Sequence, residues 1–202
     1  MDKFSFLDNQ KLLNQLKFAI EIDKMKEIFR INLLADGSRR ENDAEHSWHF
    51  AVMAMLLEEY SAEKVDVSRV IKIALVHDLV EVYAGDTYAY DAKGNEDKEQ
   101  REKEAADKLF GMLEPEQAAF FRSLWDEFEE KQTPEAKYAN AIDRIQPLIL
   151  NYLTDSATWK ANQVHSTQIL KRMDIIRTAA PELWPIVQGI VKTSIEKGIL
   201  LP

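Results

Sequence analysis

The chain has 202 residues, of which 46% are hydrophobic and 30% charged, a composition that fits one globular domain over residues 1–202. Its formal net charge of −9 argues against broad binding to nucleic acid or to an anionic membrane, although a local positive site could still bind a phosphate-bearing small molecule. Because cysteine is absent, disulfides, thiolate zinc sites and thiol nucleophiles are excluded.

The amino-terminal part of the chain predicts helices and no secretory signal. Residues 1–6 lack a long apolar core, and no stretch is long enough to span a bilayer, so we expect a cytoplasmic protein. A first helix is predicted from about residue 8 to residue 29, where apolar side chains recur at helical intervals. After a turn at Asp36-Gly37-Ser38, a second helix begins near Ala44, and a third runs from about residue 67 to residue 80.

The remainder of the chain also predicts helices, after a loop over residues 84–95. They span about residues 96–112, 115–131, 133–153, 166–178 and 181–196, with prolines near several of their starts. No segment shows a sustained two-residue alternation of apolar and polar side chains. The sequence therefore predicts an all-α fold, a compact single-domain bundle of about seven to eight helices.

His77 and Asp78 close an apolar run that begins at Val70. A histidine beside a carboxylate at the buried end of a helix costs free energy unless something offsets the desolvation, most simply a metal ion. Adjacent residues project about 100° apart on a helix, so both can reach one ion only from a helix end or a distorted turn. His46 upstream and Asp143 downstream lie in apolar helical patterns and could complete the site. Imidazole and carboxylate together suit manganese, cobalt, iron, nickel or zinc.

Each of these residues also has a simpler interpretation. A single inward-facing histidine is usually a hydrogen-bonded core residue, and Asp143 could pair with its neighbour Arg144. Four such residues on three predicted helices, two of them adjacent in the chain, favour the metal site.

These residues stand in motifs that resemble those of the HD-domain metal-dependent phosphohydrolases, most of all their small branch of 5′-deoxynucleotidases. The match covers about residues 30–153 and consists of Ala44-Glu45-His46-Ser47-Trp48, His77-Asp78-Leu79-Val80-Glu81, Gly85-Asp86 and Ala141-Ile142-Asp143-Arg144. The resemblance implies an HD-type helical bundle in which His46, His77, Asp78 and Asp143 bind one divalent ion, with magnesium a further possible metal.

The number of metal ions can also be predicted from the histidines. Members of this superfamily with two metal ions have extra histidines between the His-Asp pair and the final aspartate. Between Asp78 and Asp143 this chain has none. The sequence therefore favours a single ion and disfavours a di-iron oxygenase of the HD type.

The resemblance also implies a catalytic role for two acidic residues. Glu81 and Asp86 match residues that position water or handle the proton of the leaving group. The alternatives are that Glu81 only orients His77 and that Asp86 only forms a turn.

Arg30 matches the phosphate-binding arginine of the family, and a guanidinium group can bind two phosphoryl oxygens at once. Arg39 and Arg40, in the segment approaching His46, are competing candidates. Behind Arg30 the chain has Ile31-Asn32-Leu33, where the family has an aromatic residue thought to shape sugar selection. The preference for deoxyribose over ribose therefore stays open.

Together these residues predict a phosphomonoesterase that releases phosphate from (deoxy)nucleoside 5′-monophosphates by attack of a metal-bound water. The resemblance makes a homodimer plausible, and neither nucleic acid nor a membrane is expected as a partner. One alternative is an HD hydrolase of another phosphorylated small molecule or alarmone. A non-catalytic nucleotide sensor that keeps the metal is a second alternative, but such a site would need neither Glu81 nor Asp86.

Overall fold

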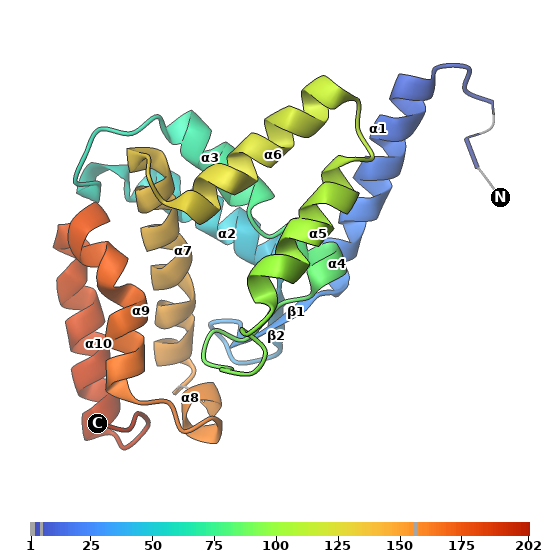
Figure 1. Cartoon of the computed structure of the whole chain (residues 1–202). Helices are drawn as coiled ribbons and strands as arrows, with labels where there is room; N and C mark the ends of the chain where they lie inside the picture. The colour runs from blue at the N-terminus through green and yellow to red at the C-terminus, as the bar shows by residue number, and fades with distance from the viewer. Residues whose placement is uncertain (1–2, 5, 156) are drawn as a thin grey trace.

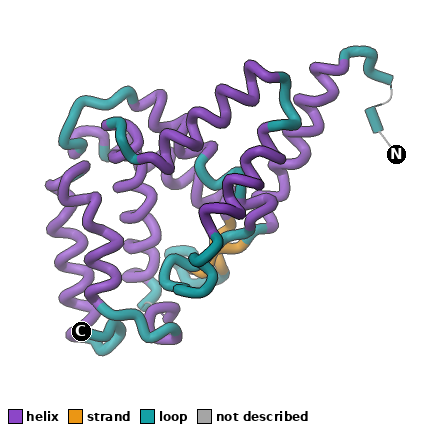
Figure 2. Tube along the Cα trace, viewed as in Figure 1, coloured by secondary structure: helices purple, strands orange, loops and turns teal. Residues whose placement is uncertain are grey.

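The part of the chain described by this computed structural model, residues 3–4, 6–155 and 157–202, is mostly helical (Figures 1 and 2). This agrees with the predicted all-α class, apart from one small hairpin made of β1 (Phe29–Leu33) and β2 (Arg40–Asn42). The helices are α1 (Gln10–Glu21), α2 (Asp43–Leu56), α3 (Val67–Val76), α4 (Glu81–Ala84), α5 (Lys98–Phe110), α6 (Pro115–Glu130), α7 (Pro134–Leu153), α8 (Ala157–Ala161), α9 (Ser166–Ala179) and α10 (Trp184–Glu196).

Helix α7 is the central element of the fold. It packs against α2, α3 and α6 on one side and against α9 and α10 on another, and Figure 1 shows α9 and α10 running beside it. Among its fully buried side chains, the core contains Phe50 and Ala54 of α2, Val70, Ile73 and Ala74 of α3, and Ile142 and Ile145 of α7. No helix of the described residues is long and apolar enough to cross a membrane.

The helix starts follow from capping side chains. The Asn42 side chain accepts from the backbone N–H of Glu45, and the Glu45 carboxylate accepts in return from the backbone N–H of Asn42, a capping box that fixes the start of α2. Asp66 caps α3, and Thr133 caps α7 just before Pro134. The helices that carry the candidate site residues therefore begin at positions set by local sequence.

The prediction of one helix over residues 8–29 is wrong at its carboxyl end. Helix α1 stops at Glu21, a 3-10 segment (Ile22–Glu27) follows, and Ile28 is already extended. Strand β1 then pairs antiparallel with β2, from Phe29 opposite Asn42 to Leu33 opposite Arg40. The two strands have only five and three residues, too few to produce a visible alternation. The predicted turn at 36–38 joins them.

The hairpin is fixed to the central helix by a polar contact. The Asn32 side chain is buried and donates to the backbone carbonyl of Pro147 in α7, at 3.2 Å. This contact places β1, and with it Arg30, against the face of α7 that carries Asp143.

Candidate metal centre and active site

His77 and Asp78 lie at the end of α3, and the helix stops one turn before the predicted residue 80. His77 is the C-cap of α3 and still has helical backbone angles. The next turn is tightened by bonds between residues three apart, from Leu79 N to Val76 O at 3.1 Å and from Glu81 N to Asp78 O at 2.9 Å. This is the distorted helix end that two adjacent residues need in order to face one point.

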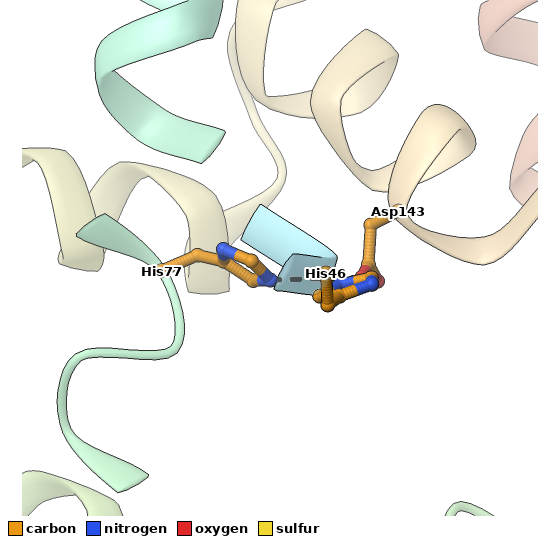
Figure 3. A group of neighbouring side chains, drawn as sticks. All are labelled: His46, His77 and Asp143. Atoms are coloured by element: carbon orange, nitrogen blue, oxygen red, sulfur yellow. Dashed lines mark hydrogen bonds and ion pairs between the residues drawn. The ribbon is translucent and has the colours of Figure 1, made fainter. Parts of the chain in front are cut away.

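The four predicted ligands come together from α2, the end of α3 and α7 (Figure 3 shows His46, His77 and Asp143). Nε2 of His46 lies 3.0 Å from Oδ1 of Asp143, and Nε2 of His77 lies 3.1 Å from Oδ2 of Asp78. Across the group, Nε2 of His77 is 3.6 Å from Asp143 and Nε2 of His46 is 3.8 Å from Asp78. Both imidazoles are buried. Two nitrogens and two carboxylates thus face one small volume.

Hydrogen bonds on the far side of each ring determine which nitrogen faces that volume. Nδ1 of His77 lies 2.8 Å from the carbonyl of Ala74, which can only accept, so Nδ1 carries the proton. The Gln146 amide nitrogen lies 2.7 Å from the Glu41 carboxylate, so Gln146 Oε1 is the acceptor for Nδ1 of His46, at 3.0 Å. Both Nε2 lone pairs are therefore available for a metal.

The Nε2 atom of His77 gives an independent test of whether a cation fits. It is buried and has no good hydrogen-bond partner among the described residues, although two carboxylates lie near it. Burial lowers the pKa of His77, but the negative charges of Asp78 and Asp143 outweigh burial and raise it to about 10. The pKa values of Asp78 and Asp143 are lowered, because the histidines outweigh burial. The pocket therefore favours positive charge, as a divalent cation site should.

Arg30 lies on β1 at the edge of this group. Its Nη1 donates to Oδ2 of Asp78 at 2.8 Å and lies 3.5 Å from Oδ1 of Asp43. Its Nε is buried without a partner among the described residues, so a donor remains for a ligand. Arg39, by contrast, is exposed and forms a two-pronged pair with Glu45, and Arg40 is exposed as well. Of the three arginine candidates, only Arg30 lies near the predicted ligands.

A group of three acidic side chains, Asp43, Asp78 and Glu81, adjoins the predicted metal ligands and shares Asp78 with them. Glu81 is the first residue of α4 and is buried, with one carboxylate oxygen unpartnered among the described residues. Burial and the neighbouring carboxylates of Asp78 and Asp43 raise the pKa of Glu81 well above its usual range. Asp43 is also fully buried; burial and then Asp78 raise its pKa to about 7. Near neutral pH these side chains can hold a proton beside the predicted metal.

The sequence analysis missed Asp43, Glu41 and Gln146 as members of the site. Asp43 stands in the first turn of α2, where an acidic residue is explained by the helix dipole alone. Gln146 stands four residues after Ile142 in a helix of apolar periodicity, and a neutral amide there gives no signal of a metal site. His49, one turn after His46, accepts from the Gln146 amide at 3.0 Å and so completes the chain of hydrogen bonds behind His46.

Asp86 lies in the loop after α4 and, with Arg30, lines an adjoining pocket. Burial raises its pKa, and the charge of Arg30 opposes the rise. We name this cavity the active-site pocket; its walls also include Asn32, Tyr88, Tyr90, Asn151, Trp159 and Arg172. The indole Nε1 of Trp159 is buried and has no acceptor among the described residues. The structure thus joins the predicted metal ligands to a polar, aromatic cavity through Arg30 and Asp86.

Comparison with known proteins gives a consistent result. An HD domain family model matches residues 22–184. The chain is 32% identical over 145 residues to the 5′-deoxynucleotidase HDDC2 of Xenopus laevis, covering 72% of this chain and 67% of that protein. It is 25% identical over 178 residues to the Homo sapiens protein of the same name, covering 81% and 86%. The crystal structure of a predicted metal-dependent phosphohydrolase from Magnetospirillum magnetotacticum is similar with a TM-score of 0.89 and 45% identity, over 96% of this chain and all of that one.

Proposed function

Since this chain belongs to the HD-domain family and is a metal-dependent phosphohydrolase, we propose that its substrates are nucleoside 5′-monophosphates, including deoxyribonucleotides. The convergence of His46, His77, Asp78 and Asp143, with Arg30 and Glu81 beside them, carries this proposal. The relatives named 5′-deoxynucleotidases support the choice of substrate.

In the proposed reaction, water adds to phosphorus, the bond from phosphorus to the sugar oxygen breaks, and that oxygen takes a proton. A divalent ion bound by the four ligands would lower the pKa of a coordinated water and polarise a phosphoryl oxygen. Arg30, held in place by its hydrogen bond to Asp78, would supply positive charge to the phosphate. Glu81, whose raised pKa lets it hold a proton near neutral pH, donates to the leaving oxygen or orients the water. Asp86 is the second candidate for that proton transfer.

The active-site pocket would receive the nucleoside. Tyr88 and Tyr90 offer aromatic surface, and Asn32, Asn151 and Trp159 offer polar groups. Its free volume is about 50 Å³, whereas ligand pockets usually have roughly 300 Å³ or more. A nucleoside could therefore enter only when side chains or the loop over residues 85–97 move.

A screen of metals against substrates tests this function directly. Phosphate release would be measured for ribo- and deoxyribonucleoside 5′-monophosphates, for a guanosine polyphosphate and for simple phosphomonoesters, each with manganese, cobalt, iron, nickel, zinc and magnesium. We expect nucleoside 5′-monophosphates to have the highest kcat/KM. A higher kcat/KM for the guanosine polyphosphate or for simple phosphomonoesters would show that this compound class is the substrate instead. Inactivity with every combination of metal and substrate would favour a nucleotide sensor.

Metal affinity should rise with pH, by about tenfold per pH unit between pH 7 and pH 9 for each proton displaced. Without metal, His77 holds a proton up to its pKa of about 10, and the ion must displace it. Asp78 and Asp143 have lowered pKa values and contribute no proton in this range. Calorimetric titrations in buffers of different ionisation enthalpy would count the protons released. An affinity that does not change with pH would contradict the role of His77 as a ligand.

Gln146→Met should weaken metal binding by about 10–100-fold, because His46 loses the acceptor that fixes its ring. A matched control is Asn140→Leu on the same helix. The Asn140 side chain is also a buried amide, and it donates to the carbonyls of Phe128 and Ala136 rather than to a site residue. Both variants should lose stability, but only Gln146→Met should lose metal affinity in a fluorescence or calorimetric titration. Equal metal affinities would show that Gln146 acts only in folding.

The homodimer and the cytoplasmic location stay predictions. Helix α2 exposes an apolar stripe of Trp48, Val52, Met55 and Leu56, spaced along one face of the helix. Such a stripe is compatible with a subunit contact. Light scattering would give the mass of the protein in solution, and a monomer would reject the dimer.

A further inference from the structure

A pocket beside the active-site pocket is lined by three cationic side chains and by no acidic one. We name it the basic pocket. It has a volume of about 460 Å³ and is lined by residues of the loop after α4, of α7 and of α9. Arg144 comes from α7, and Lys171 and Arg172 come from α9. The other lining residues are Ala89, Tyr90, Ala92, Asn95 and Gln168.

These cations are not neutralised by ion pairs within the described residues. The guanidinium group of Arg144 donates to neutral oxygens, the carbonyl of Arg172 at 2.9 Å and Oδ1 of Asn140 at 3.5 Å. Lys171 and Arg172 form no ion pair with a described residue. By contrast, Arg69 pairs with Glu127, and Arg122 pairs with Asp126. The basic pocket thus concentrates uncompensated positive charge on a chain whose net charge is −9.

Arg144 and Arg172 repel each other electrostatically, and without a bound anion nothing in the pocket lining offsets this repulsion. Arg144 is half-buried and its guanidinium group donates to the backbone carbonyl of Arg172, which brings the two arginines together in a pocket that has no acidic lining residue. The phenol of Tyr90 lies near both guanidinium groups, whose charges oppose the rise of its pKa caused by burial. A bound anion would relieve the repulsion between the arginines, and guanidinium forks match the oxygens of a phosphate group.

Arg172, Tyr90 and Ala89 line both the basic pocket and the active-site pocket. The basic pocket is therefore adjacent to the cavity that holds Arg30 and Asp86, but the predicted metal ligands do not line it. We propose that Arg144, Lys171 and Arg172 bind a second phosphate group, distinct from the one that is cleaved. That group belongs either to a doubly phosphorylated nucleotide held across both pockets or to a separate phosphate ion.

Equilibrium binding of inorganic phosphate to the full chain, followed by calorimetry without metal, tests for the site independently of catalysis. An Arg30→Gln protein removes the arginine of the reaction centre, so the binding that remains reports the basic pocket. Adding Lys171→Gln or Arg172→Gln should then weaken phosphate binding by about tenfold or more, because a charge-assisted bond is lost. The matched control is Arg177→Gln, an exposed arginine of the same helix that pairs with Asp174.

Two outcomes of this titration would overturn the proposal. One is that Arg30→Gln alone abolishes phosphate binding. The other is that Lys171→Gln and Arg172→Gln change the affinity no more than Arg177→Gln does. Lys171 is exposed, so its replacement should leave folding intact and keep the comparison valid.

Kinetics with two substrates separate the two sources of the phosphate, and this part of the test depends on the proposed nucleotidase function. A nucleoside 3′,5′-bisphosphate and the matching 5′-monophosphate would be compared in the wild type and in Lys171→Gln. If the substrate carries the second phosphate, Lys171→Gln should raise KM for the bisphosphate about tenfold and leave KM for the monophosphate unchanged. Equal effects on both, with phosphate binding lost in the titration, would identify a separate anion. Inactivity toward both would reject the nucleotidase function but leave the binding result standing.

Discussion

Asp78→Ala should remove both the bound metal and the phosphatase activity. Asp78 lies 3.1 Å from Nε2 of His77 and accepts from Arg30 at 2.8 Å, so it connects the proposed metal ligands to the arginine that we propose binds the phosphate. Losing it removes one ligand charge and frees Arg30 from its position. Because metal catalysis supplies several kcal/mol of transition-state stabilisation, we expect a loss of about 10³-fold or more in kcat/KM. Metal content after dialysis and phosphate release would be measured on the same samples.

The control for Asp78→Ala is Asp107→Ala. Asp107 also pairs with an arginine, Arg122, but it is exposed, and neither residue lines the active-site pocket. Its replacement should change neither metal content nor activity. An Asp78→Ala protein that keeps a full complement of metal would remove Asp78 from the ligand set, whatever its activity.

Glu81→Gln should keep the metal and lose most of the turnover, by about 10²–10⁴-fold in kcat. Glu81 lies next to Asp78 and Asp43 but is not among the four converging ligands. Glutamine keeps the size of the side chain and cannot exchange a proton at neutral pH. We therefore expect kcat to fall, whereas the metal affinity and KM should stay near their wild-type values. Steady-state kinetics on metal-saturated protein would measure this.

Glu127→Gln is the matched control for Glu81→Gln. Glu127 is also buried, but its carboxylate accepts from Arg69 and Thr133, neither of which is a residue of the candidate site. Its replacement should lower stability without a specific loss of kcat. If Glu81→Gln turns over substrate at the wild-type rate, Glu81 does not transfer the proton, and Asp86 becomes the remaining candidate for this role.

The helical fold and the four candidate ligands could be predicted because their signals are local. The pair His77-Asp78 ends an apolar run, and a buried imidazole beside a carboxylate needs compensation wherever it occurs. His46 and Asp143 each interrupt an apolar helix face. These predictions did not require knowledge of which helices pack together. Each polar side chain stands in an apolar segment, so the free-energy cost of burying it is visible from that segment alone.

The hydrogen bonds behind the ligands could not be predicted in the same way. Gln146 meets His46 from 100 positions away in the chain and Glu41 from 105 positions away. A glutamine on an inward helix face has many possible partners, and only the packing of α7 against α2 and β2 selects these two. The hairpin was missed for a related reason, because its strands gain their stability from pairing with each other and from the contact of Asn32 with α7.

The location of a bound ion tests the central claim most directly. Crystals grown with manganese would be measured for its anomalous scattering, which marks the ion independently of the protein. We predict one strong peak per chain, ligated by His46, His77, Asp78 and Asp143. A main peak elsewhere, two peaks in the site, or any of the four side chains turned away from the ion would contradict the account.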